Sequence, residues 1–509
     1  MKCISRFFGY GIALALLTLA IPAHATGSQA PGSSGTLPDL DMSKPVEVIM
    51  YYTGDLKPKA QELYDNINRV IKAKMPNTTL KINLLATGEY RVKYPLLFAS
   101  GESFDLAYAA TWLNFADLAK RGSFMPIEQL APKYAPKLYV RESPTAIMQA
   151  TIDGHLYALP SLWATYSAYG PVYRGDLVKG TNWNGNMKTF ADLEAYLDII
   201  KKTQPNIEPL MEYSGGSEVD DLFMFNNGIY PIKGSTGDFL FIDPKDPNPK
   251  LFTYYEYAKT PEFLAMMKRW NDAGYYPKSA LADPDGNKQQ NGKAAVRIHN
   301  IDTYDGLYIS RPDWDVKWSN FVSDVSNMAF TQDACVVASS SKNPDRALAL
   351  YDLIMSDQEL YRAFYYGIEG VTYNIRNVNG QDYVQQISPA VPDLYEFTRM
   401  WAARTKEFFL PTFGAPPDSM TLRKGFDAYI KDGVMSQKYR SFVPDFSSVA
   451  TENAACINAH MQYWWPLELA YVDTTTGLQQ YQAAMQAAGI DKVRSVLQAQ
   501  LDDYIKNYK

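Results

Sequence analysis

Cysteine and histidine are scarce, with three Cys and four His among 509 residues. The histidines have no HExxH spacing and the cysteines no Cys-x-x-Cys pair, so nothing indicates a zinc site or a catalytic histidine. A G-x-S-x-G nucleophile elbow is also lacking. Residues 286–294 (GNKQQNGKA) depart from a phosphate loop by an extra spacer and by Ala294, where a hydroxyl is needed. We therefore expect no enzyme, no catalytic residue, no metal and no cofactor.

A net positive charge and long apolar runs are lacking as well. The formal net charge is −6 at pH 7, which leaves no electrostatic footprint for nucleic acid. The apolar run over residues 12–21 has about 10 residues and is too short to span a bilayer. It follows Lys2 and Arg6 and precedes Ala23-His24-Ala25, the pattern of a cleavable secretory signal. We expect a signal peptide over 1–25, then export without membrane insertion.

Two cysteines, Cys335 and Cys456, follow the predicted cleavage site. Export permits a disulfide between them, but two buried free thiols are equally compatible with the sequence. The segment 26–45 is rich in Gly, Ser and Pro, which is typical of a flexible leader.

Strands alternate with helices from residue 46 onward. We expect strands over 46–52, 80–85 and 104–109, each followed by a helix, over 57–75, 90–100 and 112–120. This order predicts parallel sheets covered by helices on both faces. Because ligands bind beyond the carboxyl ends of such strands, the loops that follow them are candidate binding loops.

The middle and the tail follow the same order. We expect a helix over 189–203 with Thr189 as N-cap, and a second helix over 261–273 that ends at Gly274. A buried strand over 294–298 and a helix from Pro344 to Met355 come next. The tail over 476–509 predicts two helices broken at Gly489.

Aromatic residues are plentiful, with 37 Tyr and 9 Trp. Tyr and Trp combine an apolar face with a polar tip, so they can stack on sugar rings while Asp, Asn and Arg bind the hydroxyls. Any single one of them is best explained as a core residue. As a set placed at strand ends they favour a sugar-binding cleft.

Seven stretches resemble the extracellular solute-binding proteins, family 1, of carbohydrate ABC importers. They are 153–160 (DGHLYALP), 172–177 (VYRGDL), 188–193 (KTFADL), 291–295 (NGKAA), 341–347 (SKNPDRA), 366–373 (YGIEGVTY) and the tail over 442–504. The last two are similar to the large LipO-like members and their C-terminal conserved domain. Thr372 stands where that subfamily has histidine. Cys3 precedes the apolar run, so a lipoprotein is not expected.

The resemblance implies an α/β fold with two lobes, the type II periplasmic-binding-protein fold, with parallel-sheet lobes joined by strand crossovers and a helical C-terminal extension. We expect one lobe over 46–155 plus 295–345, the other over 156–294 plus 346–440, and the C-terminal region over 441–509. It also implies an oligosaccharide in the cleft between the lobes, delivery to the transmembrane permease subunits of an ABC importer, and a periplasmic or secreted monomer.

Candidate ligand-binding residues are chosen by position. They follow the first and third strands, the first crossing between lobes and the returning strand, or lie in the subfamily element: Tyr52, Thr53, Asp55, Trp112, Trp163, Tyr166, His299, Asp302, Glu369 and Tyr373.

Three alternatives stay open. One is a secreted glycoside hydrolase or lyase, which requires a carboxyl pair with matched pKa values. Another is a sensor that binds a second protein after binding sugar. A third is the same fold with a peptide or polyamine as ligand. The sequence also leaves open whether the sugar is acidic, with Arg297 and Arg376 as candidates for binding a carboxylate.

Overall fold

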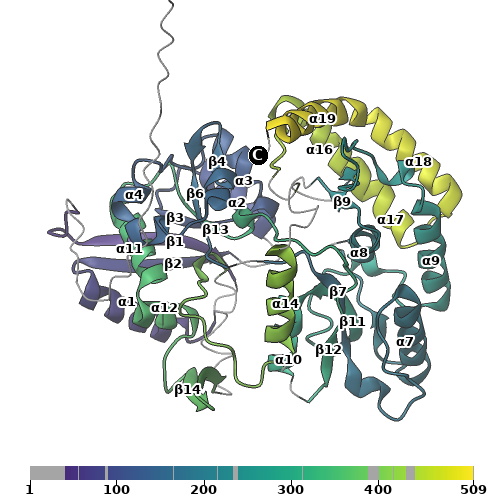
Figure 1. Cartoon of the computed structure of the whole chain (residues 1–509), viewed down its shortest axis with the longest axis horizontal. Coiled ribbons are helices and arrows are strands. Elements are labelled where there is room, and N and C mark those ends of the chain that lie inside the picture. Colours follow the sequence, from purple (N-terminus) through teal and green to yellow (C-terminus); the bar gives the residue numbers. More distant parts are fainter. Residues whose placement is uncertain are drawn as a thin grey trace, which may run out of the picture. The chain divides into compact units, whose positions relative to one another are not determined.

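The structure is a computed structural model (Figure 1). It describes residues 40–507 except 55–56, 86–89, 164, 215, 233–238, 312, 388–400, 417, 432–438 and 440–441. The chain from Leu40 onward forms one compact unit. The expected signal peptide, nearly all of the expected leader and Asp55 lie outside the described residues. In the part that is described, no helix combines the length and apolar character needed to cross a bilayer.

The first sheet has five strands in the order β2-β1-β3-β13-β6. β1 (Val46–Thr53) runs parallel to β2 (Thr78–Leu85) and to β3 (Leu106–Ala109), as the sequence predicts. β13 (Ala334–Val337) lies antiparallel between β3 and β6 (Ala158–Pro160), so the sheet is mixed rather than purely parallel. All residues of β3 and β13 are buried because helices flank the sheet on both sides (Figure 1).

The helices of the first sheet follow the predicted pattern with one exception. α1 (Ala60–Lys74) buries the expected apolar stripe, and α2 (Tyr90–Ala99) follows β2. The helix expected over 112–120 is broken at Asn114, whose φ of 62° is left-handed. It forms η1 (Thr111–Leu113) and α3 (Phe115–Lys120) instead. Asn tolerates this conformation better than most residues.

The second sheet has four strands in the order β12-β7-β11-β8. β7 (Tyr169–Arg174) pairs antiparallel with β11 (Ala294–Asn300) and β12 (Val316–Trp318), and β8 (Glu208–Leu210) runs parallel to β11. α7 (Phe190–Thr203) begins at a capping box of Thr189 and Asp192, and α9 (Thr260–Ala273) ends at Gly274 with φ 71°. Both helix ends confirm the sequence predictions.

The strand pairing corrects two of the expected lobe boundaries. Residues 295–318 were expected with the first lobe, but β11 and β12 belong to the second sheet, so the chain returns to the first sheet only before β13. α11 (Pro344–Ser356) and α12 (Gln358–Tyr365) were expected with the second lobe. Instead, α11 packs against β1 and β13, and α12 packs against α1. A short buried strand or an apolar helix face does not specify in its sequence which sheet it joins.

Shorter elements complete the described chain. They are α4 (Ala131–Tyr134), α5 (Pro136–Tyr139), α6 (Pro144–Gln149), α8 (Val219–Asn226), α10 (Ile301–Ser310), α14 (Ser419–Lys431) and the strand pairs β4 (Thr151–Ile152) with β5 (His155–Leu156), β9 (Tyr230–Pro231) with β10 (Phe241–Ile242) and β14 (Tyr373–Val378) with β15 (Gln381–Gln386). Brief 3-10 turns join several of them, η2 (Gly175–Val178), η3 (Tyr254–Glu256), η4 (Ala280–Ala282), η5 (Phe330–Gln332), η7 (Trp401–Ala403) and η8 (Ser447–Val449).

The C-terminal region is helical, as expected. α16 (Ala450–Ala459) continues through a π-helical turn η9 (His460–Trp464) into α17 (Trp465–Glu468), and α18 (Thr474–Ala487) and α19 (Ile490–Asn507) meet at Gly489. Apolar residues of these helices join the same core cluster as the second sheet and α9. Trp464 Nε1 donates a hydrogen bond to Asp220 of α8 at 2.9 Å, and the backbone N–H of Ser217 donates to Glu468 at 3.2 Å.

Candidate ligand-binding site

A chain of partly buried ion pairs runs through five side chains from three separate segments of the sequence. Arg404 donates to Asp333 at 2.7 Å and to Asp302 at 3.3 Å. Arg423 donates to the other oxygen of Asp302 at 2.6 Å and to Asp305 at 2.8 Å. The order Asp333, Arg404, Asp302, Arg423, Asp305 therefore alternates acid and base. We call these five residues the ion-pair chain.

The ion-pair chain connects the two sheets. Asp333 directly precedes β13 of the first sheet, whereas Asp302 and Asp305 lie in α10, which directly follows β11 of the second sheet. Their spacing of three residues puts both carboxylates on one face of α10. The helix begins at Asn300, whose side chain accepts from the N–H of Thr303. Arg404 and Arg423 come from the segment after η7 and from α14.

The charges of the ion-pair chain stabilise one another in a buried setting. Arg404 is 5% exposed and Arg423 8% exposed. Burial alone would raise the pKa of Asp302, but the charges of Arg423 and Arg404 outweigh it and lower that pKa to about 2. Burial raises the pKa of Asp305, with Arg423 opposing it. Asp302 is thus held as a carboxylate and is not available as a general acid.

Trp163 covers both arginines. Its ring centroid is 5.6 Å from the guanidinium carbon of Arg404 and 5.8 Å from that of Arg423, and the ring of Phe409 lies 4.6 Å away. Within the described part of the chain, the buried Nε1 donor of Trp163 has no hydrogen-bond partner. A buried donor of this kind usually has a partner, so a bound molecule that supplies an acceptor here would be stabilised.

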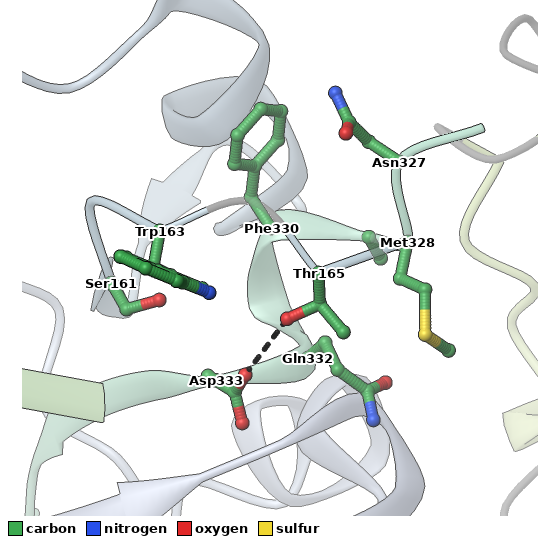
Figure 2. Close-up of a pocket in the computed structure, with 9 residues that line it drawn as sticks. Ser161, Trp163, Thr165, Asn327, Met328, Phe330, Gln332 and Asp333 are labelled. Carbon is green, nitrogen blue, oxygen red and sulfur yellow. Dashed lines mark hydrogen bonds between the residues drawn. The ribbon is translucent and has the colours of Figure 1, made fainter. Parts of the chain in front are cut away.

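A narrow pocket, too tight in this structure to admit a water molecule, adjoins Trp163 and Asp333. Figure 2 shows Trp163 on one side of it and Asn327 and Met328 on the other, with the hydroxyl of Thr165 donating to Asp333 at 3.3 Å. Its lining combines aromatic, amide, hydroxyl and carboxylate groups: Ser161, Trp163, Thr165, Asn327, Met328, Ala329, Phe330, Gln332 and Asp333. This mixture of apolar faces and convergent polar groups is typical of a small-molecule site.

Aromatic rings continue from the ion-pair chain into the first sheet. The Tyr108 hydroxyl donates to Asp333 at 2.9 Å. The Tyr108 ring lies 6.1 Å from Trp112, 5.8 Å from Trp401 and 5.1 Å from Tyr52. Trp112 and Trp401 are half-buried, so they remain partly accessible next to the charged groups.

The structure thus brings Trp163, Asp302 and, through Tyr108, Trp112 into one region. Tyr52 packs on the Tyr108 ring but is buried, and its hydroxyl accepts a hydrogen bond from the N–H of Ala402 at 2.8 Å. Thr53, the next residue of β1, is buried as well. Tyr166 is buried too and donates to Asp427 at 2.7 Å. Tyr52, Thr53 and Tyr166 are therefore packed in the core and do not line the site.

His299 lies in a second group of side chains on β11. Its ring stacks on Tyr169 with centroids 5.7 Å apart, and its Nδ1 is 2.7 Å from the Thr303 hydroxyl. Burial lowers the pKa of His299, while nearby Glu218 opposes this. The ring is therefore neutral at physiological pH.

Glu369 and Tyr373 lie in a turn before and at the start of β14. Glu369 is exposed, and Tyr373 is buried 5.6 Å from the ring of Tyr366. Thr372 donates to the carbonyl of Tyr366 and accepts from the N–H of Ile368. Among the described residues, no hydrogen bond, ion pair or ring contact joins Glu369, Thr372 or Tyr373 to the ion-pair chain, and the contacts with Tyr366 and Ile368 explain the turn locally.

Cys335 and Cys456 are both free buried thiols, so the disulfide left open by the sequence is not formed. Cys335 lies in β13, where it pairs with Tyr108 and Leu159, whereas Cys456 lies in α16 with its thiol facing the carbonyl of Ala488. Each is held by a different part of the core. Among the described residues, no group of His, Cys, Asp and Glu is arranged to hold a metal ion.

The sequence did not point to Asp333, Arg404, Arg423 or Trp401. Asp333 precedes a strand that the sequence did not single out, and Arg404 lies in a stretch without periodic apolar residues. Arg423 lies beside Leu422, Phe426 and Ile430, whose i, i+4, i+8 spacing is a helix signal that the sequence analysis did not use. Asp305 had a usable signal, since it is one helical turn from Asp302.

Comparison with known proteins gives a consistent result. The model of the bacterial extracellular solute-binding protein family matches residues 71–387, and a domain of unknown function matches residues 438–506. A carbohydrate ABC transporter substrate-binding protein of Streptococcus pneumoniae serotype 4 is 24% identical over 490 residues, covering 92% of each chain.

Solved structures share the fold. The N-glycan transport solute-binding protein NgtS of Streptococcus pneumoniae, in complex with Man5GlcNAc, has a TM-score of 0.74 and 22% identity, over 92% of this chain and 100% of that one. The alginate-binding protein AlgQ2 has a TM-score of 0.60 and 17% identity, over 90% of this chain and 98% of that one. The expected type II fold is confirmed, and the chain belongs to the bacterial extracellular solute-binding protein family.

Proposed function

We propose that this protein is the substrate-binding receptor of an ABC importer and that it captures an oligosaccharide at the ion-pair chain and the aromatic residues around it. The observation that carries the proposal is Trp163, an indole that covers two paired arginines beside a pocket and has an unpartnered buried donor. Indole faces stack on sugar rings, and charged side chains positioned by ion pairs can form hydrogen bonds with sugar hydroxyls. Family membership and the name of the pneumococcal relative support the same proposed function.

The connection between the two sheets supports a closing motion. Arg404 contacts Asp302, which follows the second sheet, and Asp333, which precedes a strand of the first sheet. A ligand that binds beside Arg404 can therefore contact groups next to both sheets. A ligand with more contacts in the closed form shifts the protein toward that form. We propose that a permease recognises the closed form, that the protein acts as an exported monomer, and that it releases its ligand unchanged.

A thermal-shift screen of the chain from Thr26 tests the proposal. The panel contains neutral and acidic oligosaccharides, with the sugar recovered and checked after each positive result. A ligand at about 100 times its Kd stabilises by about 2.7 kcal/mol, which raises Tm visibly. Recovery of intact sugar is the expected result. Cleaved sugar would instead identify a glycoside hydrolase or lyase, and stabilisation only by peptides or polyamines would assign a different ligand to this fold.

A further inference from the structure

The charge balance of the ion-pair chain bears on the kind of sugar that fits. Three carboxylates, Asp302, Asp305 and Asp333, face two guanidiniums. The set therefore carries one net negative charge. An incoming carboxylate would add a second negative charge to a poorly solvated region, which is costly unless a free cation compensates for it.

Arg404 is not such a free cation. Its Nε donates to the carbonyl of Trp401, Nη1 to Asp302 and Nη2 to Asp333. All three nitrogens are thus engaged within the protein. Arg423 donates to both Asp302 and Asp305 through Nη2. Two carboxylates therefore already compensate the charge of Arg423, and a uronic acid would compete with them for that charge.

Three other cations among the described residues near this region are paired as well. Lys406 lies 3.3 Å from Asp427, Arg141 lies 2.8 Å from Glu407, and Arg297 lies 3.4 Å from Glu218. Arg376, a candidate from the sequence, is exposed on β14 and covers the ring of Phe413 at 3.9 Å. The described part of the site therefore offers no buried arginine that awaits a carboxylate.

The unpartnered buried atoms match a hydroxyl. Asp305 Oδ1 is a buried acceptor and Trp163 Nε1 a buried donor, and neither has a hydrogen-bond partner in the structure. A sugar hydroxyl both donates and accepts, so hydroxyls can satisfy both atoms. A ligand carboxylate accepts only, and it would face Asp305 as a like charge.

Resting on the proposed function, we propose that this site selects neutral, hydroxyl-bearing oligosaccharides and rejects oligosaccharides with uronic acids. The shared fold leaves this choice open, since one solved relative is named for alginate, which is acidic, and another binds Man5GlcNAc, which is neutral. The arrangement of charges in this chain favours the neutral class.

Isothermal titration of the chain from Thr26 tests the inference with matched probes. The probes are manno-, galacto- and gluco-tetrasaccharides and the uronic acid tetrasaccharides of the same three configurations. We expect at least one neutral sugar to bind at least about tenfold more tightly than its acidic counterpart. Equal or tighter binding of the acidic sugar would overturn the inference while leaving the proposed function intact. Binding of none of these sugars, or of a neutral peptide alone, would overturn the proposed function and the inference with it.

A charge variant gives a second readout. Asp302→Asn removes one negative charge between the two arginines, so the ratio of acidic to neutral affinity should rise at least about threefold. Asp176→Asn is the matched control, because Asp176 also pairs with an arginine, Arg174, at 2.6 Å but lies in η2, outside the ion-pair chain. An unchanged ratio in a folded Asp302→Asn protein would count against the inference. The wild-type titrations decide the matter if that variant does not fold.

Discussion

The guanidinium of Arg404 lies 2.7 Å from the carboxylate of Asp333, and these residues are 5% and 6% exposed. The pair joins the segment after η7 to the residue that directly precedes β13 of the first sheet. Removing one partner of a buried pair leaves an uncompensated charge, which costs far more than the pair itself contributes. The relationship therefore gives a clear prediction for stability.

Arg404→Met should lower the free energy of unfolding by about 3–5 kcal/mol, because Asp333 and Asp302 lose their shared cation. Denaturant unfolding measures the change. Arg269→Met is the matched control, since Arg269 pairs with Glu194 but is 58% exposed, and its loss should cost less than about 1 kcal/mol. Equal effects of the two variants would mean that the ion-pair chain does not stabilise the fold.

Trp163→Ala should weaken oligosaccharide binding by about 1–3 kcal/mol with little change in fold, because the indole covers the site and its Nε1 awaits an acceptor. Titration calorimetry measures the affinity. Trp183→Ala serves as control, because Trp183 packs against Tyr196 at 5.4 Å and contacts α7 instead. Unchanged affinity in Trp163→Ala would remove this residue from the site.

Glu468→Gln should stabilise the protein at pH 8 by about 1–2 kcal/mol more than at pH 5. Burial, reinforced by Asp220, raises the pKa of Glu468 well above its usual range. The folded state therefore keeps a proton that the unfolded state loses above about pH 4.3, and the wild type loses stability as pH rises past that value. Urea unfolding of the wild type and of Glu468→Gln across this pH range tests the prediction. A parallel pH profile for wild type and Glu468→Gln would contradict the prediction.

Gly170→Ala should destabilise strongly, by about 3 kcal/mol or more, because a Cβ at Gly170 would lie 1.8 Å from the backbone oxygen of Ser319. Gly306→Ala is the counterpart. Gly306 lies in α10 with open space around its added Cβ, so alanine should stabilise by about 0.5–1 kcal/mol. Thermal unfolding distinguishes the two, and a mild effect at Gly170 would show that β7 and its neighbour can separate.

The thiols of Cys335 and Cys456 should resist Ellman's reagent in the folded protein and react fully in denaturant. Burial raises the pKa of Cys456 to about 12, and it raises the pKa of Cys335 further. The reactive thiolate is therefore scarce in both. Tm should be the same with and without reducing agent. A fall in Tm on reduction would mean that a disulfide forms after all.

Local signals in the sequence predicted much of the fold. Thr189 with Asp192 and Gly274 set helix ends through contacts within a few residues, and those ends are where they were expected. The assignment of β11 to a sheet depends instead on partners more than 80 residues away, at β7 and β8. No local pattern encodes that choice, so the predicted lobe boundary was wrong there.

The candidate site likewise has residues that the sequence predicted and residues that it did not. Trp163 and Asp302 were named because each follows a recognisable strand or crossing. Arg404 and Arg423 reach the site through tertiary packing, and only the carboxylates that surround them reveal their role. Tyr52 was named for its place at a strand end, but side chains alternate along a strand, and Tyr52 points into the core.

The C-terminal helices share one core with the second sheet, so the segment matched as a domain of unknown function, residues 438–506, has no hydrophobic centre of its own. The ring of Trp464 in this segment lies 6.2 Å from that of Phe263 in α9. A substitution on either side of this contact therefore requires a matching change on the other, which ties the evolution of the C-terminal segment to that of the region around α9.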